Sequence, residues 1–439
     1  MISRMAKTFS AKRAALALAL FAVLAGCGSS AMGGLNARAN ADPDSPPAGV
    51  SGACMKTVAP TVLGALGHVA MRVYHEGISG ERTEAAIRAV TRSIPLREAV
   101  ERGDAQAVGA AAQALVASGH MTNLRVLRGT TAAEGGSQVL ADVGAPGALA
   151  PLRGTITSAR GVPIATFLAS VWADNGFVLE TDGITEGAVV LRENGHSVAG
   201  SFKLPPGKLP AQGTLTARGV TYQYTSFPAT AFPSGSLRIY LLRSVSSTVA
   251  LCGQSQQDTL VHTVSRVASL IYSAEGGSRA LVQVRRAQQN GALLDAVAKR
   301  DPAASRQAIL GVLHDHNHVV RMRVSAADGS LLSDVGGPFV LAPVRAPLRL
   351  NGRTIGSVVL SIQDDLGYLR LTQRLAGLDV VMHRGSQLVM STLHPAPASV
   401  PAQGAYRYRG HDYRVFTLNA NAFPTGILRI SVLIPIPYS

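Results

Sequence analysis

A ten-residue stretch occurs twice in this chain, once at residues 142–151 and again at residues 334–343. The two copies read DVGAPGALAP and DVGGPFVLAP, so seven of ten positions are identical at a constant offset of 192 residues. Chance agreement of this extent is rare, even in a chain so rich in Ala, Gly and Leu. The protein is therefore predicted to be a tandem duplication with two similar units.

Hydrophobic periodicity divides each copy into a helical part followed by strands. Apolar residues recur at helical spacing over residues 54–117 and again over 258–315, with Gly residues separating the helices. The period then changes to that of strands. Each copy has about 180 residues, a normal size for one domain. We expect domain 1 to span residues 54–245 and domain 2 to span 252–439.

Strand signals are clearest in the second copy. Asp328-Gly329 and Asn351-Gly352 predict hairpin turns, and the apolar run at 356–362 predicts a buried central strand. A short helix is expected over 366–375. Further strands are expected at 380–383, 388–391, 406–408, 413–418 and 427–434. The fold class is therefore α+β, with N-terminal helices packed on an antiparallel sheet in each repeat.

The first 26 residues have the pattern of a signal peptide. Basic residues precede an apolar run, 14–25, that is short for a membrane span. The run ends in Leu24-Ala25-Gly26-Cys27, which resembles the bacterial lipobox and implies an acylated Cys27 as the new N-terminus. Residues 27–53 are predicted to be a flexible tether. We expect a lipid-anchored protein at the cell membrane that faces outside the cytoplasm.

The formal net charge is +15, and it falls to +11 when the four basic residues of the signal peptide are removed. Nucleic-acid binding would require basic and aromatic residues clustered on one surface. Here Arg is scattered along the chain and aromatic residues make up only 5%. We expect no nucleic-acid partner; attraction to anionic lipid headgroups or cell-surface polymers is the better explanation of the charge.

Two cysteines remain if Cys27 carries lipid. Cys54 and Cys252 are 198 residues apart, the same offset that relates Tyr74 to Tyr272, so they occupy matching places in the two copies. Disulfides form in exported compartments. We predict a Cys54–Cys252 bridge between the domains, which would stabilise the fold by roughly 5 kcal/mol. Two buried free thiols are the alternative.

The order of elements resembles that of the Cache family, whose extracytoplasmic sensor domains pack long N-terminal helices on a PAS-like antiparallel sheet. The resemblance rests on residues 323–334, a strand pair around the Asp-Gly turn, and on residues 351–362, which begin NGRTIG. Each copy has its own helices, so it implies two single domains in series rather than one double domain. Receptors of this family typically continue into a membrane helix and an output module. This chain stops at Ser439, so we expect a separate membrane signalling or transport partner.

Three arginines are candidates for ligand binding. Arg323, Arg345 and Arg353 lie on or beside strands that would line a PAS-like pocket. Guanidinium groups are suited to bidentate recognition of carboxylates, and the family resemblance implies small carboxylates as one ligand class. An ordinary surface position is the alternative for each arginine.

Three aspartates complete the candidate set. Asp142 and Asp334 precede a glycine-rich turn and are expected to bond its backbone, with ligand binding as the alternative. Asp365, which follows Asp364, suits acid/base chemistry. It also precedes the predicted short helix, as does Asp174 in the first copy, and helix capping is the favoured interpretation.

Catalysis and metal binding are not expected. His314, His316 and His318 have spacings at which imidazoles could meet at one ion, but only His318 has a counterpart, His120, so a solvated or structural role is preferred. The chain has no nucleophile elbow, P-loop or zinc-protease motif. We therefore expect no enzyme activity, no metal and no cofactor.

The leading hypothesis is a lipid-anchored extracytoplasmic sensor that binds a small molecule and acts with a membrane partner. The alternative is a structural or interaction lipoprotein whose PAS-like folds serve as scaffolds without ligand. A polar cavity near Arg323 and Arg345 would favour the first, and a closed apolar core would favour the second.

Overall fold

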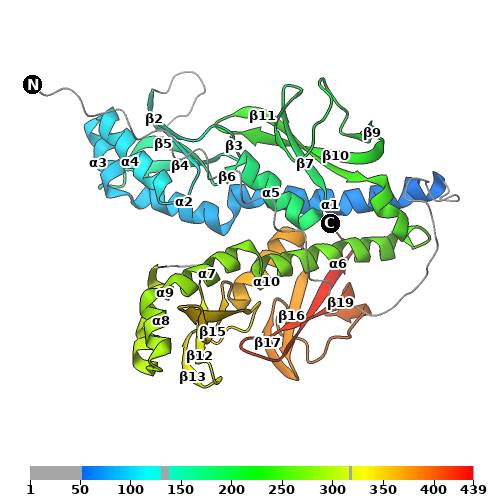
Figure 1. The fold of residues 1–439 in the computed structure, drawn as a ribbon. Helices are drawn as coiled ribbons and strands as arrows, with labels where there is room; N and C mark the ends of the chain where they lie inside the picture. Colours follow the sequence, from blue (N-terminus) through cyan, green and yellow to red (C-terminus); the bar gives the residue numbers. More distant parts are fainter. Residues whose placement is uncertain (1–51, 130–137, 316–318, 439) are drawn as a thin grey trace, which may run out of the picture. The chain divides into compact units, whose positions relative to one another are not determined.

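The computed structural model describes residues 52–129, 138–315 and 319–438. Within them, two repeats follow each other, and each begins with helices and continues into antiparallel strands (Figure 1). The predicted α+β class with two tandem repeats is confirmed. The signal peptide, Cys27 and His316–His318 lie outside the described residues.

Repeat 1 contains five helices among the described residues: α1 (Gly52–Ser79), α2 (Glu81–Arg92), α3 (Ile94–Arg102), α4 (Ala105–Ala117) and α5 (Asp174–Thr185). Its first strands are β1 (Asn123–Arg128), β2 (Val139–Gly144), β3 (Ala148–Leu149), β4 (Leu152–Thr157), β5 (Pro163–Ser170) and β6 (Trp172–Ala173). The later strands are β7 (Ala188–Glu193), β8 (His196–Gly200), β9 (Gln212–Ala217), β10 (Val220–Ala231) and β11 (Gly235–Ser244).

Repeat 2 follows a short 3-10 helix, η1 (Val245–Leu251). Its helices are α6 (Gln256–Glu275), α7 (Ser278–Gln289), α8 (Gly291–Ala298), α9 (Pro302–Asp315) and α10 (Asp365–Ala376). Its first strands are β12 (Arg321–Ala326), β13 (Leu331–Gly336), β14 (Val344–Leu350) and β15 (Arg353–Ser361). The later strands are β16 (Asp379–Arg384), β17 (Gln387–Ser391), β18 (Gly404–Tyr408), β19 (His411–Asn421) and β20 (Ile427–Ile436).

Each repeat contains two sheets, where one had been predicted. The first sheets have the orders β2-β1-β5-β4 and β13-β12-β15-β14. The second sheets contain the orders β8-β7-β11-β10-β9 and β17-β16-β20-β19-β18, with β3 and β6 added in repeat 1. The expectation of two single-sheet domains is therefore wrong in this respect, because a helix, α5 or α10, interrupts the strands and starts a second sheet.

The matching sheets share one topology. In each of the four sheets, leaving aside β3 and β6, the strand that comes first in the chain pairs with the strand that comes last. In the first sheet β1 pairs with β5, and in the last sheet β16 pairs with β20. The predicted central strand at 356–362 is β15, which lies between β12 and β14. The predicted Asn351-Gly352 turn is also present, with φ angles of 50° and 78° that suit a tight hairpin.

Helices cover one face of each first sheet. In repeat 1, α2, α3 and α4 pack on this sheet around Leu124, Val126 and Phe167. In repeat 2, α7, α8 and α9 pack around Met322, Val324 and Leu360. The alternating residues of the same strands point to the opposite face, because strand side chains alternate. That opposite face carries most of the candidate residues.

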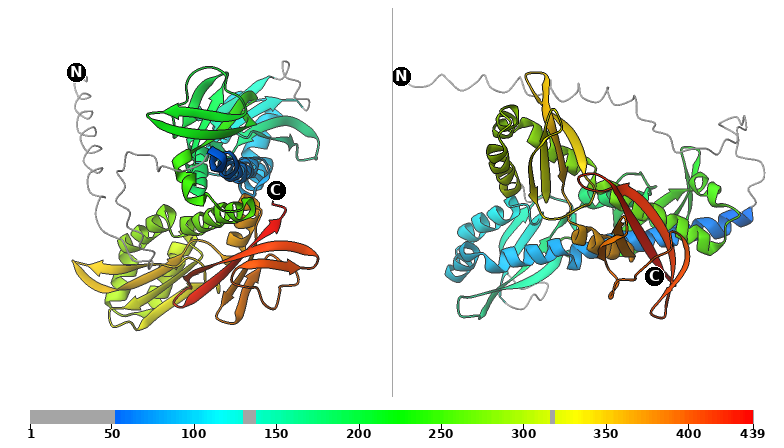
Figure 2. Two further views of the ribbon diagram at one scale, coloured as in Figure 1. Left: turned by 90° about the vertical axis from the view of Figure 1, so that its right-hand side faces the viewer. Right: turned by 90° about the horizontal axis from the view of Figure 1, so that it is seen from below.

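The second sheets belong to a core that both repeats share. Helix α1 buries an apolar stripe of Val62, Leu66, Val69 and Val73, spaced three or four residues apart. It packs against β10 and β11 of its own repeat and against α6 and α10 of repeat 2 (Figures 1 and 2). Reciprocally, α6 packs against α5 of repeat 1. In the described part of the chain, no helix is both long and apolar enough to cross a membrane.

Candidate functional site

The repeated stretch joins the two sheets of each repeat. In repeat 2 it leaves β13 and runs to β14, and the carboxylate of Asp365 in α10 accepts the amides of Val340 and Leu341, each at 3.1 Å. The carbonyl of Val340 accepts the amide of Phe423 from the β19–β20 loop at 2.8 Å. The stretch is therefore a linker that fixes the second sheet to the first.

Asp365 is not the helix cap that the sequence predicted. Asp364 caps α10, because its carboxylate accepts the Gly367 amide at 2.6 Å. Asp365 is buried, and burial raises the pKa of its carboxyl, although the Val340 and Leu341 amides oppose that shift. In repeat 1, the amide of Asp174 donates to the Gly147 carbonyl at 2.9 Å, and burial raises the pKa of its carboxyl too. These aspartates hold the linker.

Asp334 and Asp142 bond arginine side chains rather than the backbone of the glycine-rich turn. Asp334 receives a bidentate pair from Arg321, with distances of 3.1 and 2.9 Å. The same guanidinium donates to the Phe339 carbonyl at 2.9 Å and lies 4.3 Å from the Phe423 ring centroid. In repeat 1, Asp142 pairs with Arg125. The expectation of a backbone bond is corrected, because a cross-strand arginine competes successfully for each carboxylate.

Strand register places four side chains in a line across the first sheet of repeat 2. In the order β13-β12-β15-β14 the line reads Asp334, Arg323, Val359 and Arg345. The first sheet of repeat 1 carries a matching line of Asp142, Arg125, Leu168 and Arg153 in the order β2-β1-β5-β4. We call each line an arginine row. Both rows lie on the face opposite the covering helices.

The arginine rows are open rather than enclosed. Arg345 and Arg153 are exposed, whereas the aliphatic residues beside them, Val359 and Leu168, are only 4% and 9% exposed. Arg353 lies outside the row, at the start of β15 opposite Leu350, and is also exposed. The structure thus brings together Arg323, Arg345 and Asp334, and it leaves Arg353 and Asp365 elsewhere.

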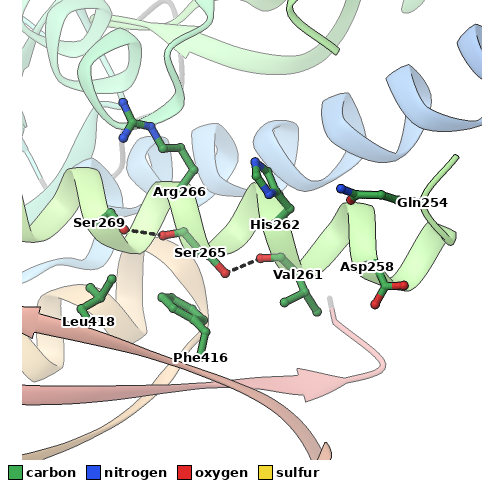
Figure 3. Close-up of a pocket in the computed structure, with 9 residues that line it drawn as sticks. All are labelled: Gln254, Asp258, Val261, His262, Ser265, Arg266, Ser269, Phe416 and Leu418. Atoms are coloured by element: carbon green, nitrogen blue, oxygen red, sulfur yellow. Dashed lines mark hydrogen bonds between the residues drawn. The ribbon is translucent and has the colours of Figure 1, made fainter. Parts of the chain in front are cut away.

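Two cavities follow helix α6 along strand β19. The larger, of about 650 Å³, is drawn in Figure 3, and none of the six candidate residues lines it. A second cavity of about 530 Å³ continues along the same two elements. The lining residues of the first are Gln254, Asp258, Val261, His262, Ser265, Arg266, Ser269, Phe416 and Leu418. We call this first cavity the α6 groove.

A ladder of serine hydroxyls runs along α6, with Ser265 and Ser269 in the α6 groove and Ser273 in the second cavity. Ser265 donates to the Val261 carbonyl at 2.5 Å, Ser269 to the Ser265 carbonyl at 2.9 Å, and Ser273 to the Ser269 carbonyl at 2.8 Å. Each hydroxyl oxygen retains lone pairs for a further donor. Across the groove lie Phe416 and Leu418 (Figure 3). The groove therefore combines hydrogen-bonding groups with an apolar wall.

Arg266 connects the α6 groove to repeat 1. It points away from β19 (Figure 3), and its Nε donates to Oε1 of Glu186, the residue that ends α5, at 3.1 Å. This bond from Arg266 holds the pKa of the Glu186 carboxyl below its usual range. Sequence reasoning missed the groove, although serines at four-residue spacing on a predicted helix were a usable signal.

The predicted disulfide remains a prediction. Cys252 forms the C-terminal cap of η1, and η1 packs against α1. Cys54 lies in the first turn of α1, but its side chain is outside the described residues. The packing of η1 on α1 brings the segment that ends at Cys252 to the helix that contains Cys54. It does not test whether the two cysteines are bonded.

Comparison with known proteins gives no family. No family model matches the sequence, and no curated protein matches it. Among solved structures, the periplasmic domain of Vibrio cholerae LuxQ is 18% identical, with a TM-score of 0.26, over 38% of this chain and 96% of that chain. The ligand-binding domain of Mlp24 with asparagine is 10% identical, with a TM-score of 0.25, over 46% of this chain and 99% of that one.

A third similar structure is an extracellular ligand-binding receptor from Desulfohalobium retbaense. It is 11% identical, with a TM-score of 0.22, over 52% of this chain and 47% of that chain. Identities and TM-scores this low carry no argument about ligand or activity. The fold of the present chain is therefore argued from its own strand order, and its function from its own side chains.

Proposed function

We propose that this protein is a lipid-anchored, extracytoplasmic small-molecule-binding protein that communicates ligand occupancy to a membrane partner. The observation that carries the proposal is the α6 groove. Its volume of about 650 Å³ lies within the range of roughly 300–1,000 Å³ typical of ligand sites. The signal peptide and the lipobox ending at Cys27 support the anchor and the compartment. No catalytic step is part of the proposal.

The groove chemistry favours a polar molecule with an apolar portion. Hydroxyls of Ser265 and Ser269 and the carboxylate of Asp258 supply hydrogen-bonding groups, and Phe416 supplies an apolar surface. The Arg266 guanidinium, the counterion that a ligand carboxylate would need, points away from β19 and is bonded to Glu186, so a carboxylate ligand would have to reach past the serine side of α6 and displace Glu186. Binding would then weaken a bond between the repeats, which gives occupancy a route to the rest of the molecule.

A thermal-shift experiment tests the proposal. The full chain is screened against a panel of small metabolites that includes mono- and dicarboxylates. A ligand present at 100 times its Kd should stabilise the folded state by about 2.7 kcal/mol. Leu418→Trp, which places a larger ring in the groove, should abolish the shift.

The matched control is Phe227→Trp, because Phe227 occupies the corresponding place on β10 of repeat 1. This variant should keep the ligand-induced shift. If no compound raises the melting temperature, or if Leu418→Trp leaves the shift unchanged, the α6 groove is not the binding site. The anchor is tested separately: mass spectrometry should find acyl chains on an N-terminal Cys27, and Cys27→Ser should abolish acylation and leave the signal peptide uncleaved.

A further inference from the structure

The outer arginines of the two rows, Arg345 and Arg153, form no ion pair within residues 52–129, 138–315 and 319–438. Asp334 and Asp142 pair with inner arginines, and such cross-strand pairs stabilise a sheet. Arg345 and Arg153 lie two strands farther along and are exposed. Among the side chains that the structure describes, no carboxylate forms an ion pair with Arg345 or Arg153. Folding alone therefore gives no reason for an arginine at these two places.

The arginine row is retained although the surrounding positions have diverged between the repeats. Arg321, next to the row in repeat 2, corresponds by register to Asn123 in repeat 1. Asp364, which caps α10, corresponds to Ala173 before α5. The Asp, Arg, aliphatic and Arg sequence across four strands is nevertheless the same in both sheets. A functional requirement that both repeats share, and that is independent of folding, would account for the presence of the arginine row in both sheets.

The geometry of the row favours an extended anionic surface over a small enclosed ligand. The two arginines of a row are separated by one strand, so their Cα atoms are about 10 Å apart. Their apolar stems flank Val359 or Leu168, which leaves the guanidinium groups free to reach outward. Among the described strand residues on this face of repeat 2, three arginines, Arg321, Arg323 and Arg345, outnumber one aspartate, Asp334. The face is therefore net positive.

We propose that the arginine rows dock this protein onto anionic phospholipid headgroups. Guanidinium groups bind phosphodiesters bidentately, and an acyl anchor at Cys27 would keep the protein at high local concentration beside that surface. The net charge of +11 that remains after removal of the signal peptide, from +15 for the full sequence, is consistent with such a partner. This docking does not depend on a ligand in the α6 groove.

Vesicle flotation tests the proposal with the mature chain, residues 27–439, carrying Cys27→Ser, so that neither lipidation nor the apolar signal segment masks weak contacts. Binding is measured on phosphatidylcholine vesicles with and without 30 mol% phosphatidylglycerol, at low and high salt. We expect binding only to the anionic vesicles and a decrease with salt. The double variant Arg153→Gln/Arg345→Gln should weaken binding about 30-fold, the combined effect of two surface cations.

The matched control is Arg92→Gln/Arg306→Gln. These arginines are also exposed, but they lie on α2 and α9, among the helices that cover the opposite faces of the two sheets. The control has the same net charge as the test variant and should bind like the parent. Equal losses in both variants, or no loss in the row variant, would overturn the proposal. Circular dichroism verifies that each variant is folded.

Discussion

Glu275 is a buried acid at the contact between the repeats. It is the last residue of α6 and is only 3% exposed. Burial raises the pKa of its carboxyl from 4.5 to about 6; Arg279 opposes the shift, and Glu180 of α5 adds to it. Arg279 and Glu180 are themselves 4.0 Å apart across the two repeats. An ionised Glu275 is therefore an unfavourable group in the folded protein.

Replacing Glu275 with Gln should remove this penalty. Raising the pKa from 4.5 to about 6 corresponds to about 2 kcal/mol, because each pKa unit is worth about 1.4 kcal/mol. The folded state binds the proton more tightly than the unfolded state. The stability that the folded state gains from this tighter proton binding at Glu275 is complete below pH 4.5 and is lost as the pH rises through about 6. Glu275→Gln should therefore gain about 2 kcal/mol relative to the parent between pH 4.5 and 7.

Urea denaturation of both proteins at several pH values between 4.5 and 7.5 measures this difference. Glu84→Gln serves as control, because Glu84 is exposed on α2, where it pairs with Arg88 one turn away, and an exposed pair of this kind contributes less than about 1 kcal/mol. A relative gain for Glu275→Gln below about 0.5 kcal/mol, smaller than half the effect of one pKa unit, would refute the reasoning. Stabilisation that decreased with rising pH would refute the sign.

Two further experiments test the linker and the cysteine pair. Asp365→Asn should destabilise the fold by about 1–3 kcal/mol in urea, because the bonds from the linker amides lose their charged acceptor and an NH2 donor replaces Oδ2, which accepts the Val340 amide at 3.3 Å. The neighbouring Asp364→Asn should be nearly neutral, since Asn caps helices as well as Asp does; equal effects would contradict the assigned roles. Non-reducing peptide mapping should recover one linked peptide pair containing Cys54 and Cys252, whereas two alkylatable thiols would disprove the bridge.

Turns, helices and single strands could be predicted where they depend on residues that are close together in the sequence. The Asn-Gly turn at 351–352 requires positive φ angles that these residues adopt readily, and both angles are positive. The helix expected over 366–375 is α10, Asp365–Ala376. Short apolar runs likewise located β15 and β16 within a few residues. These elements depend on neighbours in sequence, which a single sequence reveals.

Long-range pairing was not predictable in the same way. Strand patterns do not state which strands share a sheet, so the division at α10 into two sheets was missed. The partner of Asp334 was missed for a similar reason, because Arg321 becomes its neighbour only through cross-strand register. The α6 groove depends on the distance between a helix and a strand that are far apart in sequence. The arginine row required the register of four strands at once.

The contact between the repeats is reciprocal, and this bears on how a ligand could act. Helix α1 of repeat 1 packs on α10 of repeat 2, with Glu76 and Arg374 3.3 Å apart; α6 of repeat 2 packs on α5 of repeat 1 through Arg266 and Glu186. Duplication within one chain keeps both halves of this contact at a high effective concentration. A ligand in the α6 groove that engaged Arg266 would alter the α5–α6 contact and leave the α1–α10 and α1–α6 contacts intact. The expected response is therefore a change in angle between the repeats rather than their separation.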